Sequence, residues 1–480
     1  MQVTAPMLRT ASILALACAW HAGCTGGCQG PGCAEEFAAA RLTWLGPPFD
    51  GVSVLPRDAI ARWDGGFLDD AERTPEGTDW SAVFLGATVL IGQPDAERVV
   101  RVEAREDRVV VPQTTYQARS SDFGAALMLR RRGAVTDLWV GAPSDTRSQG
   151  AIHVFRNVED DPELVTTDDA ELRIVGRTAA DELGTSMLAC PDWTGDGLGE
   201  VLVAAPRFAA SAAEPTVMPV PNLAGAVFLL TSEALAGRTG TVSITEIGRG
   251  WWGEEIGHGA GTGIACDEAG IYVGAPWVRP EVPTGDANAA QGRVYVLPVD
   301  PIAEPGRLDE VASAVLEGPT PDGWFGTALA ALDLGEVRAL VVGAPGANGG
   351  IGQVDAYRIQ AGLPPGYWAS FLPDPDHGIP DHLGRSLASG DFDGDGLSDL
   401  LVGAPDYRAD SESYDVGRLW LWAGSGAGGW SEDGQRVGTA DHVIRGTQPF
   451  MRIGRGVHVG DADGDGTDDL LVPTRAETLQ

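Results

Sequence analysis

A short string recurs along the chain, and it restricts the possible folds more than any other feature. Its clearest copy is the run Leu-Leu-Val-Gly-Ala-Pro that ends at Pro405. Altered copies, the weaker first and last ones included, end at Pro94, Pro143, Pro206, Pro276, Pro345 and Pro473. Successive prolines lie 49 to 70 residues apart. Self-similarity at such a period is typical of repeat architectures, so the chain is predicted to hold seven copies of one unit.

Two further markers accompany the string. A hydrophobic residue followed by glycine lies upstream, at 123–124, 183–184, 256–257, 325–326, 383–384 and 453–454. A glycine that opens a run rich in valine, leucine and aromatic residues lies downstream, at positions 150, 225, 292, 352 and 417. Such short runs bounded by glycine and proline predict strands. The markers of each repeat together therefore predict four strands per repeat.

Seven four-stranded sheets have exposed edges unless the array closes on itself, which a β-propeller achieves by radial packing. We predict an all-β fold over residues 41–480, a seven-bladed β-propeller of four-stranded antiparallel blades. The last repeat stops at Gln480, after its second strand. The strand-like stretches 41–45 and 51–55 belong to no repeat, so they are expected to complete the last blade. A ring of six or eight blades is the structural alternative.

Acidic loops with metal-ligand spacing lie between the first two predicted strands of three repeats. Calcium takes six to eight oxygen ligands in a flexible cage, and a glycine at the sixth position permits the tight turn. The two full loops offer Asp391, Asp393, Asp395, the carbonyl of Leu397 and Asp399, and Asp461, Asp463, Asp465, the carbonyl of Thr467 and Asp469. A third, weaker set is Asp192, Thr194, Asp196, the carbonyl of Leu198 and Glu200. The alternative is an acidic hairpin without a cation, but its crowded carboxylates would repel one another.

These markers together resemble the FG-GAP repeat, the unit of the N-terminal propeller of integrin α-chains. The resemblance covers roughly residues 80–480. It implies a seven-bladed propeller that binds two to three Ca²⁺ ions through the three sets of residues named above. The chain resembles bacterial secreted or lipid-anchored relatives rather than an integrin.

Charge excludes several classes of function. The 33 basic residues are all arginine, against 68 acidic residues, so the formal charge is 33 − 68 = −35. This balance disfavours nucleic acid and anionic membranes as partners. The lack of lysine excludes Schiff-base chemistry and a phosphate-loop lysine.

The N-terminus predicts export. Residues 1–23 resemble a signal peptide, whose apolar run at 11–20 is too short to span a membrane. Residues 22–24, Ala-Gly-Cys, resemble a bacterial lipoprotein site that would lipidate Cys24, although secretion after Ala17 or Ala19 stays open. Residues 24–40 form a linker rich in cysteine and glycine. The chain is therefore expected outside the cytoplasm, as an outer-membrane or cell-surface lipoprotein or in secreted form.

The other cysteines leave pairing open. Cys28 and Cys33 are candidates for a small disulfide, or, with Cys24, for a metal cluster. Cys190 and Cys266 occupy the same position in neighbouring repeats, so they predict either a bridge between blades or two buried thiols.

Strand polarity places the loops between strands two and three, and those between blades, on the face opposite the metal loops. Trp251, Trp252 and Trp324 are candidate ligand contacts there, or they pack between blades. His377 and His382 lie near aspartates, but Asp381 recurs in the repeat frame and is interpreted as structural.

We expect a calcium-stabilised extracellular binding or adhesion module, monomeric and without catalytic activity of its own. Its partner would be an extracellular protein or glycan, and it would touch a membrane only through a lipid anchor. The alternative is a lectin or carbohydrate-active enzyme that uses His377 and His382.

Overall fold

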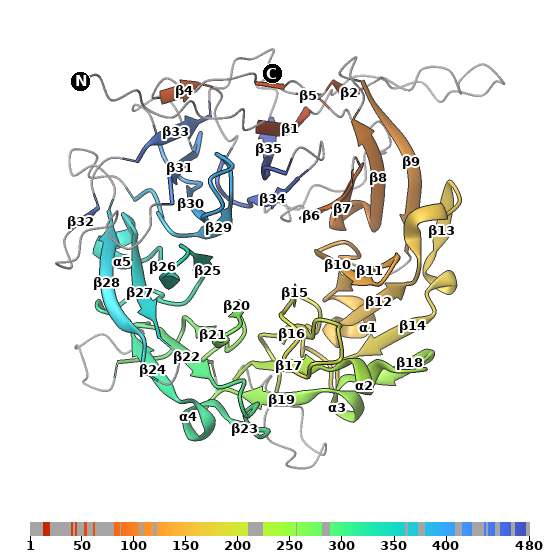
Figure 1. The fold of residues 1–480 in the computed structure, drawn as a ribbon, viewed down its shortest axis with the longest axis horizontal. Coiled ribbons are helices and arrows are strands. Elements are labelled where there is room, and N and C mark those ends of the chain that lie inside the picture. Colours follow the sequence, from red (N-terminus) through yellow and green to blue (C-terminus); the bar gives the residue numbers. More distant parts are fainter. Residues whose placement is uncertain are drawn as a thin grey trace.

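The structure of the chain is a computed structural model. It describes residues 81–86, 88–104, 109–118, 122–209, 224–255, 257–280, 289–360, 363–372, 380–408, 415–424, 440–446, 452–461 and 466–476. It also describes the short strands at 13–19, 40–41, 44–45, 52–54, 61–62 and 436–437. The strands form sheets that follow one another in chain order around a central opening (Figure 1). The predicted all-β propeller is confirmed.

Six sheets have four consecutive antiparallel strands, and we number these blades in chain order. Blade one contains β6 (Ser81–Leu85), β7 (Thr88–Gln93), β8 (Arg98–Ala104) and β9 (Val109–Gln117). Blade two contains β10 (Ala126–Arg132), β11 (Val135–Ala142), β12 (Ala151–Phe155) and β14 (Leu172–Val175). Blade three contains β15 (Ser186–Ala189), β16 (Val201–Ala205), β17 (Ala226–Leu230) and β19 (Arg249–Trp252).

Blade four contains β20 (Gly263–Asp267), β21 (Gly270–Ala275), β22 (Arg293–Leu297) and β24 (Ala314–Glu317). Blade five contains β25 (Leu329–Asp333), β26 (Arg338–Ala344), β27 (Gln353–Ile359) and β28 (Gly366–Phe371). Blade six contains β29 (Ser386–Gly390), β30 (Asp399–Ala404), β31 (Arg418–Trp422) and β33 (His442–Arg445).

Helices among the described residues are single turns. The α-helical turns are α1 (Asp145–Ser148), α2 (Ser232–Leu235), α3 (Ile244–Ile247), α4 (Leu308–Val311) and α5 (Ala347–Gly350). The 3₁₀ turns are η1 (Pro94–Ala96), η2 (Val158–Asp160) and η3 (Thr167–Asp169). None of the described helices is long and apolar enough to cross a membrane.

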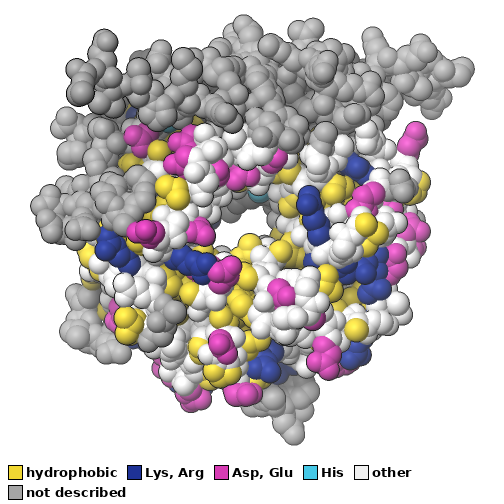
Figure 2. All heavy atoms as spheres, in the orientation of Figure 1, with side chains coloured by type: hydrophobic (Ala, Val, Ile, Leu, Met, Phe, Trp, Pro, Cys, Tyr) yellow, Lys and Arg dark blue, Asp and Glu magenta, His cyan; other side chains and the backbone are white. Residues whose placement is uncertain are grey.

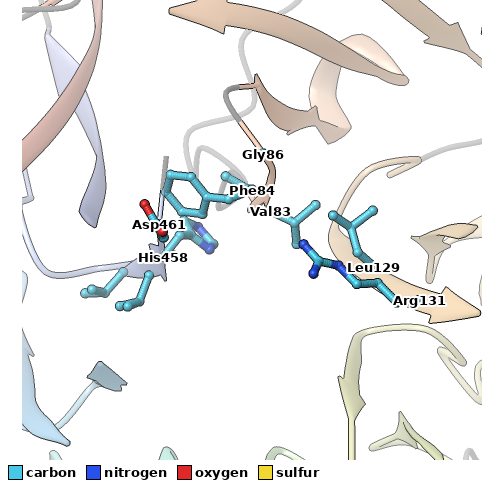
Figure 3. A pocket seen from close by; sticks show the side chains of 11 residues that line it. Val83, Phe84, Gly86, Leu129, Arg131, His458 and Asp461 are labelled. Atoms are coloured by element: carbon cyan, nitrogen blue, oxygen red, sulfur yellow. The ribbon is translucent and has the colours of Figure 1, made fainter. Parts of the chain in front are cut away.

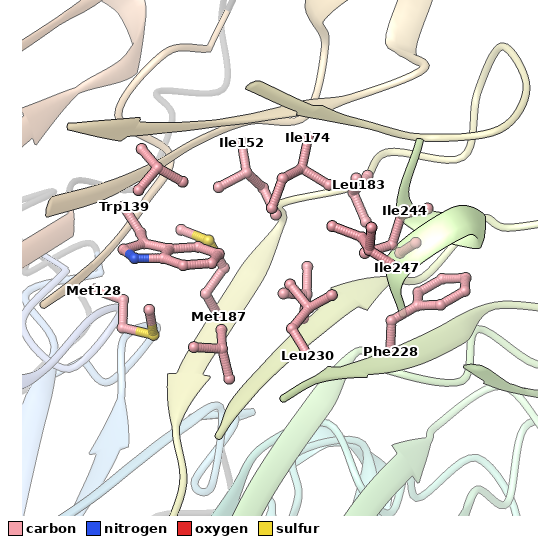
Figure 4. Packing of buried hydrophobic residues seen from close by; sticks show 14 of the residues in the cluster. Met128, Trp139, Ile152, Ile174, Leu183, Met187, Phe228, Leu230, Ile244 and Ile247 are labelled. Carbon is pink, nitrogen blue, oxygen red and sulfur yellow. The ribbon is translucent and has the colours of Figure 1, made fainter. Parts of the chain in front are cut away.

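The hydrophobic core lies between the blades. The second strands, which carry the recurring string, are buried along β7, β16, β21 and β30 because neighbouring blades cover both of their faces. Figure 4 shows one such contact, where Met128 and Trp139 of blade two meet Met187 and Leu230 of blade three. Burial of this kind stabilises by about 25 cal/mol per Å² of apolar surface, so the ring is stabilised mainly where blades meet.

The recurring glycines are explained by close contact between blades. A Cβ on Gly343 of blade five would lie 2.1 Å from the carbonyl oxygen of Gly384, the marker glycine of blade six. Gly384 itself has φ of +86° and donates its N–H to the Gly403 carbonyl at 3.0 Å. A side chain at either position would push two backbones apart, which requires glycine.

One upstream marker was assigned wrongly. Gly261, rather than Gly257, donates its N–H to the carbonyl of Gly274 at 2.9 Å, as Gly384 does to Gly403. Ala260 also forms the β-bridge to Gly225 that Leu383 forms to Gly352. Alanine replaces the large hydrophobic residue in this repeat, which concealed the marker in the sequence.

A parallel fifth strand covers the outer edge of five blades. These strands are β13 (Leu164–Thr166), β18 (Gly240–Ser243), β23 (Gly306–Arg307), β32 (Arg436–Val437) and β4 (Val52–Val54), on blades one, two, three, five and six. The first four belong to the connection between strands three and four of the following blade. They extend each sheet beyond the four predicted strands.

The prediction of seven complete blades is wrong for the described strands, because six sheets have four antiparallel strands. A further sheet pairs β34 (His458–Gly460) with β35 (Asp469–Ala476), and its next strand is β1 (Ile13–Ala19), which runs parallel to β35. In a complete blade strands two and three are antiparallel, as Leu400–Trp422 pairing shows in blade six.

The N-terminal strands are divided among several sheets. β3 (Trp44–Leu45) and β5 (Ala61–Arg62) pair with β1, whereas β2 (Ala40–Arg41) pairs with β9. β4 pairs with β33 of blade six. The stretch at 51–55 therefore contributes to blade six rather than to the last blade. The rest of the predicted signal peptide and linker, with Cys24, Cys28 and Cys33, lies outside the described residues.

The structure joins Cys190 and Cys266 in a disulfide with Cα atoms 5.8 Å apart. Cys190 directly follows β15, and Cys266 lies in β20. The bridge therefore links the innermost strands of blades three and four at the end that carries the metal loops.

Candidate metal loops and the opposite face

Loop A, residues 391–399, is ordered by its own first carboxylate. Asp391 accepts the N–H groups of Gly394 at 2.7 Å and Asp395 at 3.1 Å through Oδ1, and that of Gly396 at 2.9 Å through Oδ2. Asp395 in turn accepts the N–H of Leu397 at 2.8 Å. These bonds wind the loop so that one ligand atom each from Asp391, Asp393 and Asp395 lies within 4.8 Å of the others.

Asp399, the ninth residue of loop A, lies beneath the turn. Its exposure is 1%, and its carboxylate accepts the N–H of Phe392 at 2.9 Å and of Gly424 at 2.6 Å. Burial raises the pKa of Asp399 to about 7, with the charges of Asp393 and Asp395 adding to the rise and both backbone N–H groups opposing it. Burial likewise raises the pKa of Asp393. The loop therefore concentrates negative charge that a divalent cation would neutralise.

Loop C, residues 192–200, has the same turn but a different interior. Asp192 accepts the N–H groups of Gly195 at 2.7 Å and Gly197 at 2.7 Å, as Asp391 does in loop A. Thr194, however, donates its hydroxyl to Glu200 at 2.7 Å, so two predicted ligands are bonded to each other. This arrangement favours weaker metal binding than in loop A.

An arginine that the sequence did not predict contacts loop C. Arg130 of blade two is buried and donates Nε at 3.1 Å and a terminal nitrogen at 2.9 Å to the carbonyl of Gly199. The residue equivalent to Arg130 is Leu332 in blade five, opposite loop A, and Gly390 in blade six, opposite loop B. At this position of the three blades, the residue beside loop C, which has fewer carboxylates, is therefore charged, whereas those opposite loops A and B are not.

Loop B, residues 461–469, is described only at its ends. Asp461 accepts the N–H of Gly466 at 3.1 Å, which matches the bond from Gly396 to Asp391 in loop A. Asp469 is buried, and Thr467 is 9% exposed. The predicted ligands Asp463 and Asp465 lie outside the described residues.

The metal loops also connect the blades. The N–H of Asp468 in loop B donates to the carbonyl of Asp391 in loop A at 2.8 Å, and the N–H of Asp391 donates to the Asp468 carboxylate at 2.9 Å. Ser398 of loop A donates its N–H to the carbonyl of Asp333 of blade five at 2.8 Å. An ordered loop therefore holds its blade against the preceding one.

A cavity of about 620 Å³ opens beside loop B, between blades one and two and the last sheet. Phe84, His458 and Asp461 line one side of it and Arg131 extends from the other (Figure 3). Around the central opening, acidic side chains and arginines lie interspersed with apolar ones (Figure 2).

On the opposite face, Trp251 follows the second of the two predicted alternatives and packs between blades. Trp251 has 0% exposure, and its indole N–H donates to the carbonyl of Glu304 at 2.8 Å. Trp252 is half-buried and packs against the core between blades two and three. Side chains alternate along a strand, so β19 directs these two tryptophans into the cores on either side of blade three.

Trp324 is 39% exposed and belongs to a small cluster. Its ring lies parallel to that of His382, with the ring centres 6.1 Å apart. His382 Nδ1 lies 2.7 Å from Asp406 Oδ2, and, although burial opposes it, contact with His382 lowers the pKa of Asp406. We call Trp324, His382 and Asp406 the Trp–His–Asp cluster. The other predicted histidine, His377, lies outside the described residues.

Asp381 is buried, and its repeat equivalent Asp181 has a structural role. Asp181 accepts the N–H groups of Arg177 at 2.8 Å and Thr178 at 2.7 Å, which closes a turn. Asp406 is the functional candidate that sequence reasoning missed. It directly follows the recurring string at Pro405, and it meets His382 from a different blade connection.

Comparison with known proteins agrees with these features. The FG-GAP repeat family matches residues 383–422, which include the marker Leu383, loop A and β31. The chain therefore contains an FG-GAP repeat at these residues, and it is similar to integrin α-chains. Integrin alpha-PS2 of Drosophila melanogaster is 39% identical over 98 residues, 20% of this chain and 7% of that protein.

Other similar proteins differ in their stated activities. Phosphatidylinositol-glycan-specific phospholipase D of Bos taurus is 38% identical over 90 residues, 19% of this chain and 11% of that protein. Both relatives are thus matched over a small part of their own length. Among solved structures, Kuenenia stuttgartiensis hydrazine synthase has a TM-score of 0.41 at 12% identity, covering 75% of this chain and 80% of that chain. At that TM-score the likeness carries no argument.

Proposed function

We propose that this FG-GAP chain is an extracellular, calcium-stabilised binding module without catalytic activity of its own. The observation that supports it most is the arrangement in loop A, where the ligand atoms of Asp391, Asp393 and Asp395 lie within 4.8 Å of one another. Loops A and B would each hold one ion, and loop C would hold a third more weakly.

The donor set of loop A fits calcium. Hard cations of this kind take carboxylate and carbonyl oxygens, and the loop supplies both without any nitrogen or sulfur ligand. Asp391, Asp393 and Asp395 would hold the ion, with the Leu397 carbonyl and Asp399 completing the set. The bound ion would supply charge neutralisation, which strengthens the contact between blades that Ser398 and Asp468 make.

The proposed location is extracellular. A disulfide such as Cys190–Cys266 persists in oxidising compartments. Export by the N-terminal segment, with Cys24 as a lipid anchor or with release into the medium, remains part of the proposal. The protein would act as a monomer, because a net charge of −35 opposes self-association.

Metal content tests the calcium part. Protein purified without chelator should contain two to three calcium ions per chain by elemental analysis. Chelator should lower its melting temperature, and added calcium should restore it. Protein that contains no calcium and melts at the same temperature in chelator would refute this part.

The opposite face is the proposed binding surface, because loops on a rigid scaffold commonly carry binding. A screen of glycans and matrix proteins, with and without calcium, would identify the ligand. The Trp324→Ala variant should weaken the interaction, whereas the Trp252→Ala variant should mainly lower stability. Equal binding by Trp324→Ala and the unchanged protein would place the ligand elsewhere.

The Trp–His–Asp cluster favours a second candidate, a lectin or carbohydrate-active enzyme. An exposed indole suits a sugar ring, and a histidine held by a carboxylate is a common general base. His382→Ala and Asp406→Asn should abolish turnover of glycan substrates if the chain is an enzyme. If the chain is a binding module, the unchanged protein and both variants should show only background cleavage of glycans.

A further inference from the structure

The outer edge of blade four differs from the other outer edges. Five blades have a parallel fifth strand beside their fourth strand: β13, β18, β23, β32 and β4. Among the described residues, no strand pairs with the outer side of β24 (Ala314–Glu317), the fourth strand of blade four. Within the part of the chain that the structure describes, its backbone donors and acceptors on that side have no strand partner, which is the arrangement to which another strand can add.

The side chains of β24 match this arrangement. None of its four residues is buried, whereas β14, β19, β28 and β33 each contain buried residues. Val315 is 41% exposed, and Glu317 is exposed as well. An exposed valine on an edge strand is unfavourable in an isolated protein and suits a partner that covers it.

Chain length explains why the following blade supplies no described covering strand to blade four. The fifth strands of blades one, two, three and five come from connections at residues 156–171, 231–248, 298–313 and 423–441. The corresponding connection for blade four is only residues 360–365. Six extended residues span at most about 20 Å. Packed sheets lie about 10 Å apart, so a connection that crosses from blade five to blade four and returns uses all of that length. This connection cannot form a strand beside β24.

We propose that the outer edge of β24 binds an extended, basic segment of a partner protein, which adds to blade four as a fifth strand. The other blades indicate the form of the occupant, because each covering strand runs parallel to the fourth strand. The covering strand of blade six, β4, comes from a distant part of the sequence. A covering strand therefore does not have to be continuous with the neighbouring blade. Strand addition of this kind is a known mode of peptide recognition.

Charge indicates the chemistry of the segment. Residues 298–317, which include β24, contain five acidic residues and one arginine, a net charge of 1 − 5 = −4. The side chains of Glu310 and Glu317 are 64% and 45% exposed, although Glu310 lies 3.8 Å from Arg307 and Glu317 lies 2.9 Å from Arg293. A segment that alternates apolar residues with lysine or arginine would cover Val315 and share these carboxylates with the two arginines. A second copy of this chain fits poorly, because both copies carry a net charge of −35.

The inference is independent of the proposed calcium sites and of the opposite face, so its test is run with calcium present. The probe is a fluorescent ten-residue peptide of alternating valine and arginine. A peptide of the same composition with two central residues replaced by proline is the control, because proline cannot donate to a sheet. Fluorescence anisotropy measures binding, and hydrogen–deuterium exchange locates it.

We expect the alternating peptide to bind and to slow exchange at residues 314–317, and the proline peptide to bind at least about tenfold more weakly. Val315→Arg should weaken binding to a similar degree, because it adds like charge at the contact. Leu164→Arg, at an apolar position on β13 of blade one that is 62% exposed against 41% for Val315, should leave binding unchanged. If Val315→Arg does not fold, the test still rests on whether the peptide slows hydrogen exchange at residues 314–317 of the unchanged protein.

Three results would overturn the proposal. Alternate N–H groups of β24 face β22, so the outward ones of Val315 and Glu317 are informative: slow exchange there in the free, monomeric protein would show that the edge is already covered. Protection of these residues that grows with protein concentration would identify a second copy as the occupant. Peptide binding that neither protects 314–317 nor responds to Val315→Arg would place the basic segment elsewhere.

Discussion

Single carboxylates in this protein have distinct tasks. In loop A, Asp391 accepts three backbone N–H groups and thereby shapes the turn, whereas Asp393 accepts one, from Asp395 at 3.1 Å. The first carboxylate is thus needed for the loop conformation and the second mainly for the ion. This division makes Asp393 the better residue for testing metal binding.

Asp393→Asn should lower the calcium affinity of loop A by roughly tenfold or more, because affinity depends on the number of charged ligands. The fold should persist, since the hydrogen bonds to Asp391 remain. Isothermal titration measures the affinity, and Glu336→Gln, on the exposed hairpin of blade five, is the control. Unchanged affinity in Asp393→Asn would exclude loop A as the site.

Asp145 offers a test by pH. It accepts a hydrogen bond from Arg173 at 2.6 Å and lies 3.7 Å from His153 Nε2. Burial acts to raise the pKa of Asp145, but its contacts with His153 and Arg173 outweigh burial and lower it. The folded pKa is thus below the unfolded value of about 3.9, so the stabilisation is complete above that pH and is lost as the pH falls through the folded pKa.

Asp145→Asn should therefore reduce the free energy of unfolding by about 1 kcal/mol or more at pH 7, as expected for a hydrogen bond to a charged group. The difference from the unchanged protein should shrink below pH 4. Urea unfolding between pH 3 and 7 measures it, with the exposed Asp168→Asn as the control. A difference that stays constant down to pH 3 would contradict the assigned cause.

At the scale of strands, local patterns were reliable where they had a local cause. The apolar string predicted the buried second strands because each is covered on both faces, and its glycine lies where a Cβ would meet a neighbouring backbone at 2.1 Å. The patterns failed where the cause lay elsewhere in the fold. The sequence left Trp251 open between a ligand contact and packing between blades, because its burial depends on the core between blades three and four.

The disulfide is the strongest single link between two elements. Reduction, or Cys266→Ser, should lower the free energy of unfolding by about 2–5 kcal/mol, because the bridge closes a long loop. The bridged residues are 76 positions apart. Thermal melts with and without reductant measure this effect, and reductant should have no further effect on Cys266→Ser. An unchanged protein that is insensitive to reductant would argue against a role for the bridge in stability.

For the whole molecule, net charge is the dominant long-range term. A charge of −35 destabilises a compact state through self-repulsion. Two bound calcium ions would reduce it to −35 + 4 = −31. Their larger effect would be local, because they would neutralise the loops that connect blades five and six and the last sheet.

Salt should therefore substitute in part for calcium. In chelator, the melting temperature should rise between about 0.01 and 0.15 M NaCl, since the Debye length falls from about 30 to 8 Å. With saturating calcium the rise should be smaller. Differential scanning calorimetry measures both series, and an equal rise in both would show that the loops are not a main site of repulsion.

The strand content, the propeller class and the positions of the acidic loops could be predicted from the repeat pattern alone. These follow from patterns within one repeat, where the residues that pack or bend together are neighbours in the chain. Three-dimensional contacts were needed to show which sheets are complete and that Cys190 pairs with Cys266. The same holds for the pairing of Asp406 with His382 and for the lack of a covering strand on β24 among the described strands. Those features arise from contacts between blades, whose residues lie tens to hundreds of positions apart, and no local pattern records which distant partner meets them.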